Sequence, residues 1–467
     1  MITRRAALGS AVSALATAAA SSALAQGLAY DPAIETATTI ADGFTFAAVG
    51  DIIYPLPMAG SPDARFQEAI RPLKDADLAY GNLEMSIIDA PRFSGVPSYL
   101  FMGSPEVAED LKAMGFDAIG RANNHLYDYG PEGMLETNRH LDAAGIVHSG
   151  SGPNYGAARA PRYLMTSKGR VSFVTAATTH SPTFTPLFQI VRALPATSEM
   201  AGRAGMSVLG TTQIFTIPPS LAPSVQAVKQ AFPTGGALYA PTGDTPTRFS
   251  AMGQEFKVAD VDGPQFTYEV DRQDVEAILR SVREGKIKSD FLIFGLHTHE
   301  TRFAAKPDTD PEPGDFLQGF ARQVIDAGAD SFVGTGVHVL RGIEIYKDRP
   351  IYYGLGEFFR QMDINRPSGQ APQRGDVNSD PAKYESVVAV NRFEGGSLAE
   401  VRLHPVTLGA QMRMAHRGVP RAASAADARR ILARLQALSA PYGTTIAIED
   451  NIGVIRLRTP TRRTGRS

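Results

Sequence analysis

The sequence contains no cysteine in 467 residues. This absence excludes disulfide bonds, a thiolate nucleophile and any zinc site built from thiolates. A metal ion in this protein must therefore be bound by histidine, aspartate, glutamate or asparagine. Such nitrogen and oxygen ligands suit manganese, zinc, iron or magnesium.

A strong excess of either charge is also absent, because 46 Lys and Arg residues stand against 48 Asp and Glu residues, giving a formal net charge of -2. This balance does not indicate nucleic acid or an anionic membrane as the main partner, and we expect no nucleic-acid partner. A content of 43% hydrophobic and 20% charged residues is typical of a soluble globular protein. The length predicts one large domain with insertions, or two domains.

The first 25 residues predict an export signal. Arg4 and Arg5 lie in a short charged start, an alanine-rich run follows, and Ala23-Leu24-Ala25 forms a small-residue cleavage site. The paired arginines favour a twin-arginine signal, with an ordinary Sec signal as the alternative. We therefore expect an exported protein, periplasmic or extracellular, with a linker over residues 26–42. Because no later apolar run is long enough to span a membrane, we expect no transmembrane segment in the mature chain.

Hydrophobic periodicity predicts strands that alternate with helices, which is typical of an α/β sandwich with its site at the carboxyl ends of the strands. Strands are expected at 44–51, 77–84, 116–125, 171–177, 290–300, 330–338, 342–346, 349–358, 386–393, 398–405 and 445–457. Helices are expected at 62–75, 104–115, 131–144, 271–285, 316–328 and 425–439. Residues 179–262 are rich in Pro, Gly, Ser and Thr and predict an irregular insertion, either a lid near the site or a surface excursion. Residues 362–381 predict a polar loop.

Five polar clusters follow predicted buried strands. They are Gly50-Asp51, Asn82-Leu83-Glu84, Asn123-Asn124-His125, His297-Thr298-His299-Glu300 and Val337-His338. Each alone is a weak signal, because a Gly-Asp pair is usually a turn and a lone histidine is usually structural. Burying so many carboxylates and imidazoles together is unfavourable unless a divalent cation neutralises them. Since the carboxyl ends of parallel strands meet at one edge, we expect Asp51, Glu84 and His297 to converge as ligands of a hydrolytic metal site.

The order of these motifs resembles the bacterial capsule-synthesis CapA family of poly-γ-glutamate biosynthesis. The resemblance covers roughly residues 44–460, and its most specific part is the A-N-N-H-x-x-D-Y-G segment. The matching segments are Gly50-Asp51, Asn82–Glu84, Ala122–Gly130, His297–Glu300, Gly334–Tyr346 and Pro350–Phe358.

The resemblance implies a fold similar to the calcineurin-like metallophosphoesterases, a β-sandwich flanked by helices (α-β-β-α). This fold is expected over residues 43–410, followed by a C-terminal extension at 411–460 that packs on the domain and a tail at 461–467. The resemblance also implies site roles. Asp51, Glu84, Asn124, His297 and His338 would be metal ligands for one or two divalent ions. His125 would act as general acid or oxyanion stabiliser, oriented by Asp128. Further ligands or neighbours of the ligands would be Asn82, Asn123, His299, Glu300 and Glu357.

The sequence departs from the family pattern at two places. Thr335 and Gly336 stand where the family commonly carries a histidine before His338, and Glu357 replaces the asparagine of L-G-N-F. The missing histidine would weaken one metal site, while Glu357 could partly compensate as an oxygen ligand. Two ions, one ion, a different ion or none are the alternatives.

The leading functional hypothesis is a metal-dependent hydrolase in the biosynthesis, trimming or export of an anionic capsule polymer, poly-γ-glutamate by resemblance. Its partners would be that polymer or a phosphoester substrate, together with envelope proteins that synthesise or export the polymer. One alternative is a non-catalytic polymer-binding or assembly factor on the same fold, favoured by Thr335 and Glu357. The other is a general periplasmic phosphodiesterase without a capsule role.

Overall fold

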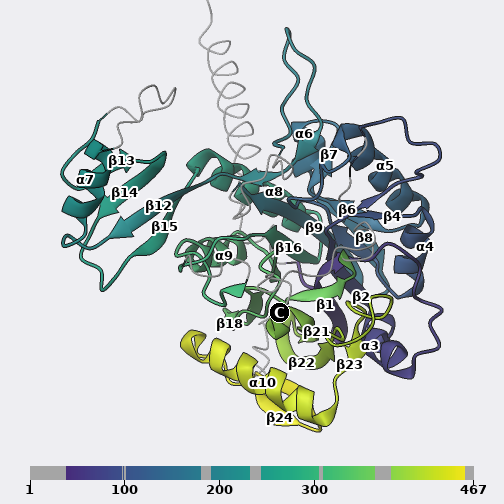
Figure 1. The fold of residues 1–467 in the computed structure, drawn as a ribbon. Helices are drawn as coiled ribbons and strands as arrows, with labels where there is room; N and C mark the ends of the chain where they lie inside the picture. The colour runs from purple at the N-terminus through teal and green to yellow at the C-terminus, as the bar shows by residue number, and fades with distance from the viewer. Residues whose placement is uncertain are drawn as a thin grey trace, which may run out of the picture. The chain divides into compact units, whose positions relative to one another are not determined.

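The computed structural model describes residues 38–96, 98, 101–179, 191–231, 243–303, 309–362 and 380–457 (Figure 1). The predicted signal at 1–25, the tail at 461–467 and most of the predicted linker and polar loop lie outside these residues. All elements below belong to the compact unit Thr39–Ser467. Within the described ranges, no helix is both long enough and apolar enough to cross a membrane.

The first large sheet contains the strands that lead to Asp51 and Glu84. Its order is β24-β25-β22-β21-β1-β2-β5-β6, with β20 beside β1 and β23 beside β22. The strand bounds are β1 Phe44–Ile53, β2 Leu78–Leu83, β5 Ala118–Gly120, β6 Val147–Ser149, β20 Glu357–Arg360, β21 Glu385–Glu394, β22 Ser397–Thr407, β23 Arg421–Ala422, β24 Ala447–Glu449 and β25 Ile452–Arg456. Strands β1, β2, β5, β6 and β20 run parallel, so their carboxyl ends share one edge.

The second large sheet contains the strands that lead to His297 and Thr335. Its order is β11-β9-β16-β17-β19-β18, with β8 beside β9. The bounds are β8 Arg162–Thr166, β9 Gly169–Thr178, β11 Val208–Leu209, β16 Phe291–His297, β17 Ser331–Thr335, β18 Ile343–Tyr346 and β19 Arg349–Tyr352. Strands β9, β16, β17 and β19 are parallel, which brings a second set of carboxyl ends to one edge.

The two sheets share one hydrophobic core. Side chains alternate along β1, so that Phe44 and Phe46 face the second sheet while Ala47 and Val49 face helices. The ring of Phe291 in β16 lies 5.0 Å from Phe44 and 6.2 Å from Phe46, between centroids. Face-to-face packing of this kind buries the inner faces of both sheets.

Helices cover the outer faces of both sheets, as the alternating pattern predicts. Helices α3 (Ala64–Asp75), α4 (Glu106–Ala113) and α5 (Gly130–Ala143) pack on the first sheet. Helices α8 (Arg272–Ile287) and α9 (Leu317–Asp326) pack on the second, as Figure 1 shows. Helix α10 (Ala425–Ser439) packs against the shared core. The chain is thus a mixed α/β protein, which confirms the predicted class.

Side-chain caps fix where several of these helices begin. Ser424 accepts a hydrogen bond from the Asp427 amide at 3.2 Å and starts α10. Asp271 accepts from two amides at the start of α8, and Asp63 does the same for α3. These oxygens satisfy amides that have no partner within the helix.

Several predicted strand boundaries are wrong, and β16 and β17 end three residues before the predicted 300 and 338. The strand expected at 116–125 is only β5, because the residues after Gly120 leave the ladder and place their side chains in the site. The strand expected at 349–358 divides into β19 and β20, which belong to different sheets, with Gly356 at φ +71° between them. The final strand expected at 445–457 is the hairpin β24 and β25.

The prediction that residues 179–262 are irregular is also wrong for the part that the structure describes. This stretch contains β10 Gly205–Met206, β11, β12 Thr211–Ile217, α7 Ala222–Ala231, β13 Arg248–Ala251 and β14 Gln254–Val258. With β15 (Gln265–Val270), three of these strands form a sheet in the order β13-β14-β12-β15. Its small core includes Phe249 and Phe256, so most positions along its strands remain partly exposed and give little periodicity. Shorter elements elsewhere are β3 Ser86–Ile87, β4 Met102–Gly103, β7 Ser151–Gly152 and α6 Tyr155–Arg159.

Replacing Phe291 with alanine should test the shared core. The ring is 1% exposed and also lies 4.7 Å from Phe393, so Phe291→Ala should lower the free energy of unfolding by about 3–5 kcal/mol. Urea denaturation followed by circular dichroism measures this loss. Leu56→Ala, at a side chain 56% exposed, is the matched control and should change stability by less than about 0.5 kcal/mol. Equal effects of the two substitutions would contradict a core shared by both sheets.

Candidate metal centre

The strand ends of both sheets meet around Asp51. Asp51 lies near the end of β1, Asn82 near the end of β2, and His297 is the last residue of β16. The Nδ2 atom of Asn82 donates to Oδ1 of Asp51 at 2.7 Å and lies 3.2 Å from Nδ1 of His297. One asparagine therefore joins the carboxyl edges of the two sheets.

Asp51 is a fully buried carboxylate with two hydrogen-bond donors. Besides Asn82, the backbone amide of Gly336 donates to its Oδ2 atom at 2.8 Å. Burial alone would raise the pKa of Asp51, but its contact with His297, the charge of His338 and the amide of Asn82 bring this pKa below its ordinary value. Asp51 is thus a buried carboxylate whose ionised form is favoured by its neighbours.

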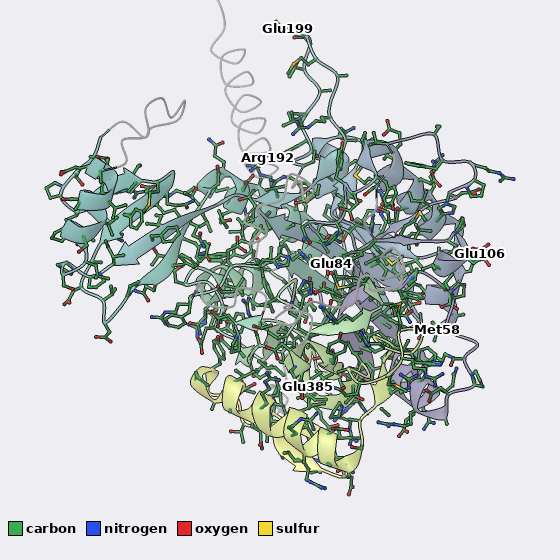
Figure 2. The ribbon with its side chains drawn as sticks, viewed as in Figure 1. Met58, Glu84, Glu106, Arg192, Glu199 and Glu385 are labelled. Atoms are coloured by element: carbon green, nitrogen blue, oxygen red, sulfur yellow. The ribbon has the colours of Figure 1, made fainter. Side chains whose placement is uncertain are left out.

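Glu84 is fully buried one residue beyond β2, and Figure 2 shows it among the interior side chains. Its Oε1 atom lies 3.5 Å from Nε2 of His297 and 4.0 Å from Nε2 of His125. Neither oxygen has a hydrogen-bond partner among the residues that the structure describes. Burial and the charges of Asp51 and Glu357 raise the pKa of Glu84 well above its ordinary value.

Two groups of donor atoms share Glu84. One comprises Asp51, Glu84 and His297, the other comprises Glu84, His299 and His338, and within each group the donor atoms lie within 4.8 Å of one another. Both groups are buried and combine carboxylate with imidazole, the donor set that divalent zinc, manganese or iron prefers. The unpartnered oxygens of Glu84 are what a cation would satisfy, so these residues fit one or two divalent ions.

His297 is surrounded by polar groups on both ring nitrogens. Its Nε2 atom lies 2.8 Å from Oδ1 of Asn124 and 3.1 Å from Nε2 of His299. Its Nδ1 atom lies 3.2 Å from the hydroxyl of Thr335. Burial lowers the pKa of His297 despite its contact with Asp51, so the imidazole is neutral, as a metal ligand must be.

His125 is oriented by Asp128. The Nδ1 atom of His125 lies 2.8 Å from Oδ2 of Asp128, and the ring of Phe101 lies 4.4 Å from the imidazole, between centroids. The side-chain oxygen of Asn123 accepts from the His125 amide at 3.1 Å. These contacts leave Nε2 of His125 directed toward Glu84.

His338 occupies a left-handed backbone position with φ +62°, which is rare for a residue other than glycine. Its Nδ1 atom lies 3.2 Å from Oε1 of Glu357, while the other oxygen of Glu357 pairs with the buried guanidinium of Arg360. Burial would raise the pKa of Glu357, but Arg360 and His338 lower it below its ordinary value. Glu357 lies next to His338, although neither atom of this contact has a hydrogen-bond partner among the described residues.

Glu300 lies outside both donor groups. Its Oε2 atom accepts from the hydroxyls of Thr178 at 2.6 Å and Thr298 at 2.8 Å, and its Oε1 atom accepts from Thr211 at 2.6 Å. Hydroxyl donors occupy both oxygens, so Glu300 supports the chain next to His299 rather than offering a ligand.

The structure brings many of the residues that the sequence indicated for the site into contact with one another. His299 joins a donor group, Asn82 and Glu357 contact proposed ligands, and Asn123 contacts Asn82. The hydrogen bonds of Glu300 go to threonine hydroxyls instead. Sequence reasoning gave no role to Arg360 or to the Gly336 amide. The structure requires glycine at 336, because φ is +105° and the backbone of Thr298 lies 2.9 Å from where a Cβ would be.

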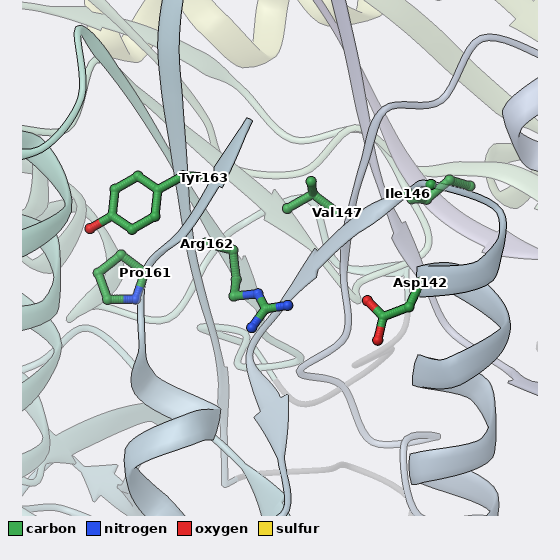
Figure 3. A pocket seen from close by; sticks show the side chains of 7 residues that line it. Asp142, Ile146, Val147, Pro161, Arg162 and Tyr163 are labelled. Atoms are coloured by element: carbon green, nitrogen blue, oxygen red, sulfur yellow. The ribbon is translucent and has the colours of Figure 1, made fainter. Parts of the chain in front are cut away.

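A surface cavity of about 370 Å³ lies elsewhere, between α5 and β8. Figure 3 shows the guanidinium of Arg162 and the carboxylate of Asp142 pointing toward one another across it. Asp142 also contacts Nε2 of His148 at 3.1 Å, and burial lowers the pKa of His148 to about 4. No residue of the candidate metal centre lines this cavity.

The family model described as bacterial capsule synthesis protein PGA_cap matches residues 45–362, which contain the whole candidate centre. The chain belongs to the PGA_cap family. The resemblance to CapA proteins expected from the motifs is therefore confirmed, and the two donor groups around Glu84 are a feature of a PGA_cap protein.

The proteins similar to this chain include two CapA proteins. The uncharacterised protein y4sH of Sinorhizobium fredii is 41% identical over 462 residues, covering 92% of this chain and 96% of that protein. The capsule biosynthesis protein CapA of Bacillus anthracis is 22% identical over 75% of this chain and 68% of its own length. The PGA biosynthesis protein CapA of Bacillus subtilis is 23% identical over 71% of this chain and 67% of its own length.

Glu84→Gln should change the pH dependence of stability in metal-free protein. Because the folded-state pKa of Glu84 is raised, the stability that its protonated form contributes is present at low pH and lost as pH rises above the ordinary carboxylate range. Glutamine does not titrate, so in EDTA the variant should be more stable than wild type at about pH 7.5, by about 1–3 kcal/mol, and similar at about pH 4.

Thermal unfolding of both proteins across this pH range measures the difference. Added Mn²⁺ should reverse the order by stabilising wild type more than the variant. If wild type and variant lose stability in parallel with pH in EDTA, the pKa of Glu84 is not raised in the folded protein.

Proposed function

We propose that this PGA_cap protein is an exported, metal-dependent hydrolase that acts on an anionic envelope polymer, with poly-γ-glutamate as the polymer that the family suggests. The observation that carries the proposal is Glu84. Its two buried oxygens have no hydrogen-bond partner in the described part of the chain, yet both donor groups include it. A carboxylate in this position is unfavourable without a cation and useful with one.

A divalent cation held by these groups would supply Lewis acidity, which polarises a phosphoryl or acyl oxygen and makes water a stronger nucleophile at neutral pH. Asp51, Glu84, His297, His299 and His338 would hold it. The buried Asp51 anion and the neutral His297 ring are already in the protonation states that ligands need.

His125 is the residue best placed to deliver a proton to the leaving group. Asp128 holds its Nδ1 side, so the ring cannot turn freely and its Nε2 atom stays on the side of Glu84. A proton on Nε2 can therefore pass to the oxygen or nitrogen of the bond being broken, which becomes the leaving alcohol or amine. Phe101 packs on the same ring and limits its contact with water.

The layered arrangement supports the calcineurin-like metallophosphoesterase architecture as part of this proposal. Two sheets share a core, helices cover the outer faces, and the candidate centre lies at the carboxyl ends of parallel strands. Export through a twin-arginine signal and association with envelope polymer synthesis or export proteins remain predictions from the sequence and the family.

A second candidate function is a polymer-binding or assembly factor that performs no hydrolysis. The observation in its favour is Thr335, which stands where the family commonly carries a histidine. Its hydroxyl lies 3.2 Å from Nδ1 of His297, and a hydroxyl is a poorer ligand than an imidazole.

His125→Ala should abolish most of the activity. With Mn²⁺ or Zn²⁺, wild type should hydrolyse bis(p-nitrophenyl) phosphate or shorten poly-γ-glutamate, and His125→Ala should lower kcat by about 10²–10⁴-fold because the proton donor is lost. Asp128→Asn should lower it by about 10–100-fold, since the ring loses its orienting carboxylate. Initial rates and polymer chain length measure these effects. His140→Ala, a partly exposed histidine on α5, is the matched control and should resemble wild type.

Metal removal should have the same effect as the loss of His125. Dialysis against EDTA should remove turnover, and Mn²⁺ or Zn²⁺ should restore it. Wild type that contains no metal and turns over neither substrate, with His125→Ala indistinguishable from it, would contradict hydrolysis. Retention of poly-γ-glutamate by such a protein would support the binding factor instead, and turnover of the phosphodiester alone would indicate a general phosphodiesterase.

A further inference from the structure

Arg121 is a buried cation to which the proposed chemistry assigns no role. It follows β5 directly, and it is among the largest fully buried side chains of the described residues. Its backbone amide donates to the carbonyl of Ser149 in β6 at 2.9 Å. The main chain of Arg121 is thus held by β6, while its guanidinium reaches the segment that follows β2.

The guanidinium binds the main chain on both sides of Glu84. Its Nη1 atom donates to the carbonyl oxygens of Leu83 and Met85, each at 2.8 Å. Asn123 adds a second hydrogen bond to the Leu83 carbonyl at 2.8 Å, and the Glu84 amide donates to Ile52 of β1 at 3.1 Å. The peptide unit before Glu84 is therefore held at both its carbonyl and its amide, and the Met85 carbonyl is held beyond it. These bonds restrict the backbone on both sides of Glu84 and so limit where its side chain points.

Space filling does not account for this side chain. Transferring a guanidinium into the core is costly, and an apolar side chain of similar size often stabilises a protein more. Burial lowers the pKa of Arg121 to about 9, with Asp128 acting in the opposite direction, so the group is still a cation at neutral pH. Arg121 is thus a buried positive charge hydrogen-bonded to the segment that carries Glu84.

We propose that Arg121 is a positioning residue for Glu84. Through the carbonyls of Leu83 and Met85 it holds the carboxylate where both donor groups can share it. The inference rests on the proposed function in one respect, namely that divalent cations bind at these groups. If Arg121 only fills the core, its loss changes stability and leaves metal affinity as it was.

Mn²⁺ titration of the full-length chain by calorimetry tests this role. Arg121→Met should weaken every Mn²⁺-binding event of the wild type by about 10–100-fold, because Glu84 belongs to both donor groups. His338→Ala should weaken mainly one event, since His338 belongs to one group. Arg121→Lys retains a cation on a shorter, flexible stem and should give an intermediate affinity.

The matched control is Arg159→Met. Arg159 is also buried and donates to a backbone carbonyl, that of Val208, but its ionic partner is Asp274 rather than any group of the centre. This variant should lower the thermal midpoint in EDTA and keep the Mn²⁺ dissociation constant within about twofold of wild type. Should Arg121→Met fail to fold, Arg121→Gln, which is shorter but polar, takes its place in the same titration.

The outcomes separate the two proposals. Wild type that binds Mn²⁺ together with a folded Arg121 variant of unchanged affinity would overturn the positioning role and leave the metal centre intact. Wild type that binds no Mn²⁺ would overturn the proposed function itself. Weakened binding in Arg121→Met with normal binding in Arg159→Met would support the inference.

Discussion

The burial of Glu84 beside Asp51 and Glu357 is the constraint on which the candidate centre depends. The carboxylates of Asp51, Glu84 and Glu357 are all buried and repel one another when ionised. Each has different neighbours. Asn82 and the Gly336 amide satisfy Asp51, and Arg360 neutralises Glu357. Glu84 alone is left without a hydrogen-bond partner among the described residues, and the donor groups converge on it. Burial raises the pKa of Glu84, because its charged form has no hydrogen-bond partner among these side chains when no cation is bound.

The two-sheet core makes this arrangement possible. Parallel strands β1 and β2 deliver Asp51 and Glu84, while β16 and β17 of the other sheet deliver His297 and Thr335. The sheets pack together through Phe44 and Phe291 at the amino ends of β1 and β16, and Asn82 contacts both Asp51 and His297 at the carboxyl edges. The backbone also positions individual groups at this edge. The amide of Gly336 donates to Asp51, and His338 adopts a left-handed conformation.

The sequence predicted the strands that carry ligands because each is an apolar run that ends in a polar cluster. The rule that parallel strands share an edge brings Asp51 and Glu84 together, because both follow strands of the first sheet. His297 ends a strand of the second sheet, so its place beside them depends on how the two sheets pack. The role of Glu300 could not, since it depends on hydroxyls from Thr178 and Thr211, which are distant in sequence. The sheet around β12 was missed because its strands are partly exposed and lack strong alternation.

Membership of the PGA_cap family and the geometry address different questions. The family and its CapA relatives connect the protein with capsule and poly-γ-glutamate synthesis. The geometry concerns chemistry, and Thr335 and Glu357 stand where the sequence is expected to depart from the common family pattern. One oxygen of Glu357 pairs with Arg360 and the other lies 3.2 Å from His338, so its role as an additional oxygen ligand stays a prediction.

Anomalous diffraction from crystals grown with Mn²⁺ tests the central claim most directly. Glu84 is claimed to be a carboxylate that a divalent cation neutralises. Anomalous density is expected at coordination distance from the Glu84 carboxylate, next to Asp51 and His297, or next to His299 and His338, or both. Crystals with Mn²⁺ bound only elsewhere, or with no anomalous density near Glu84, would contradict it.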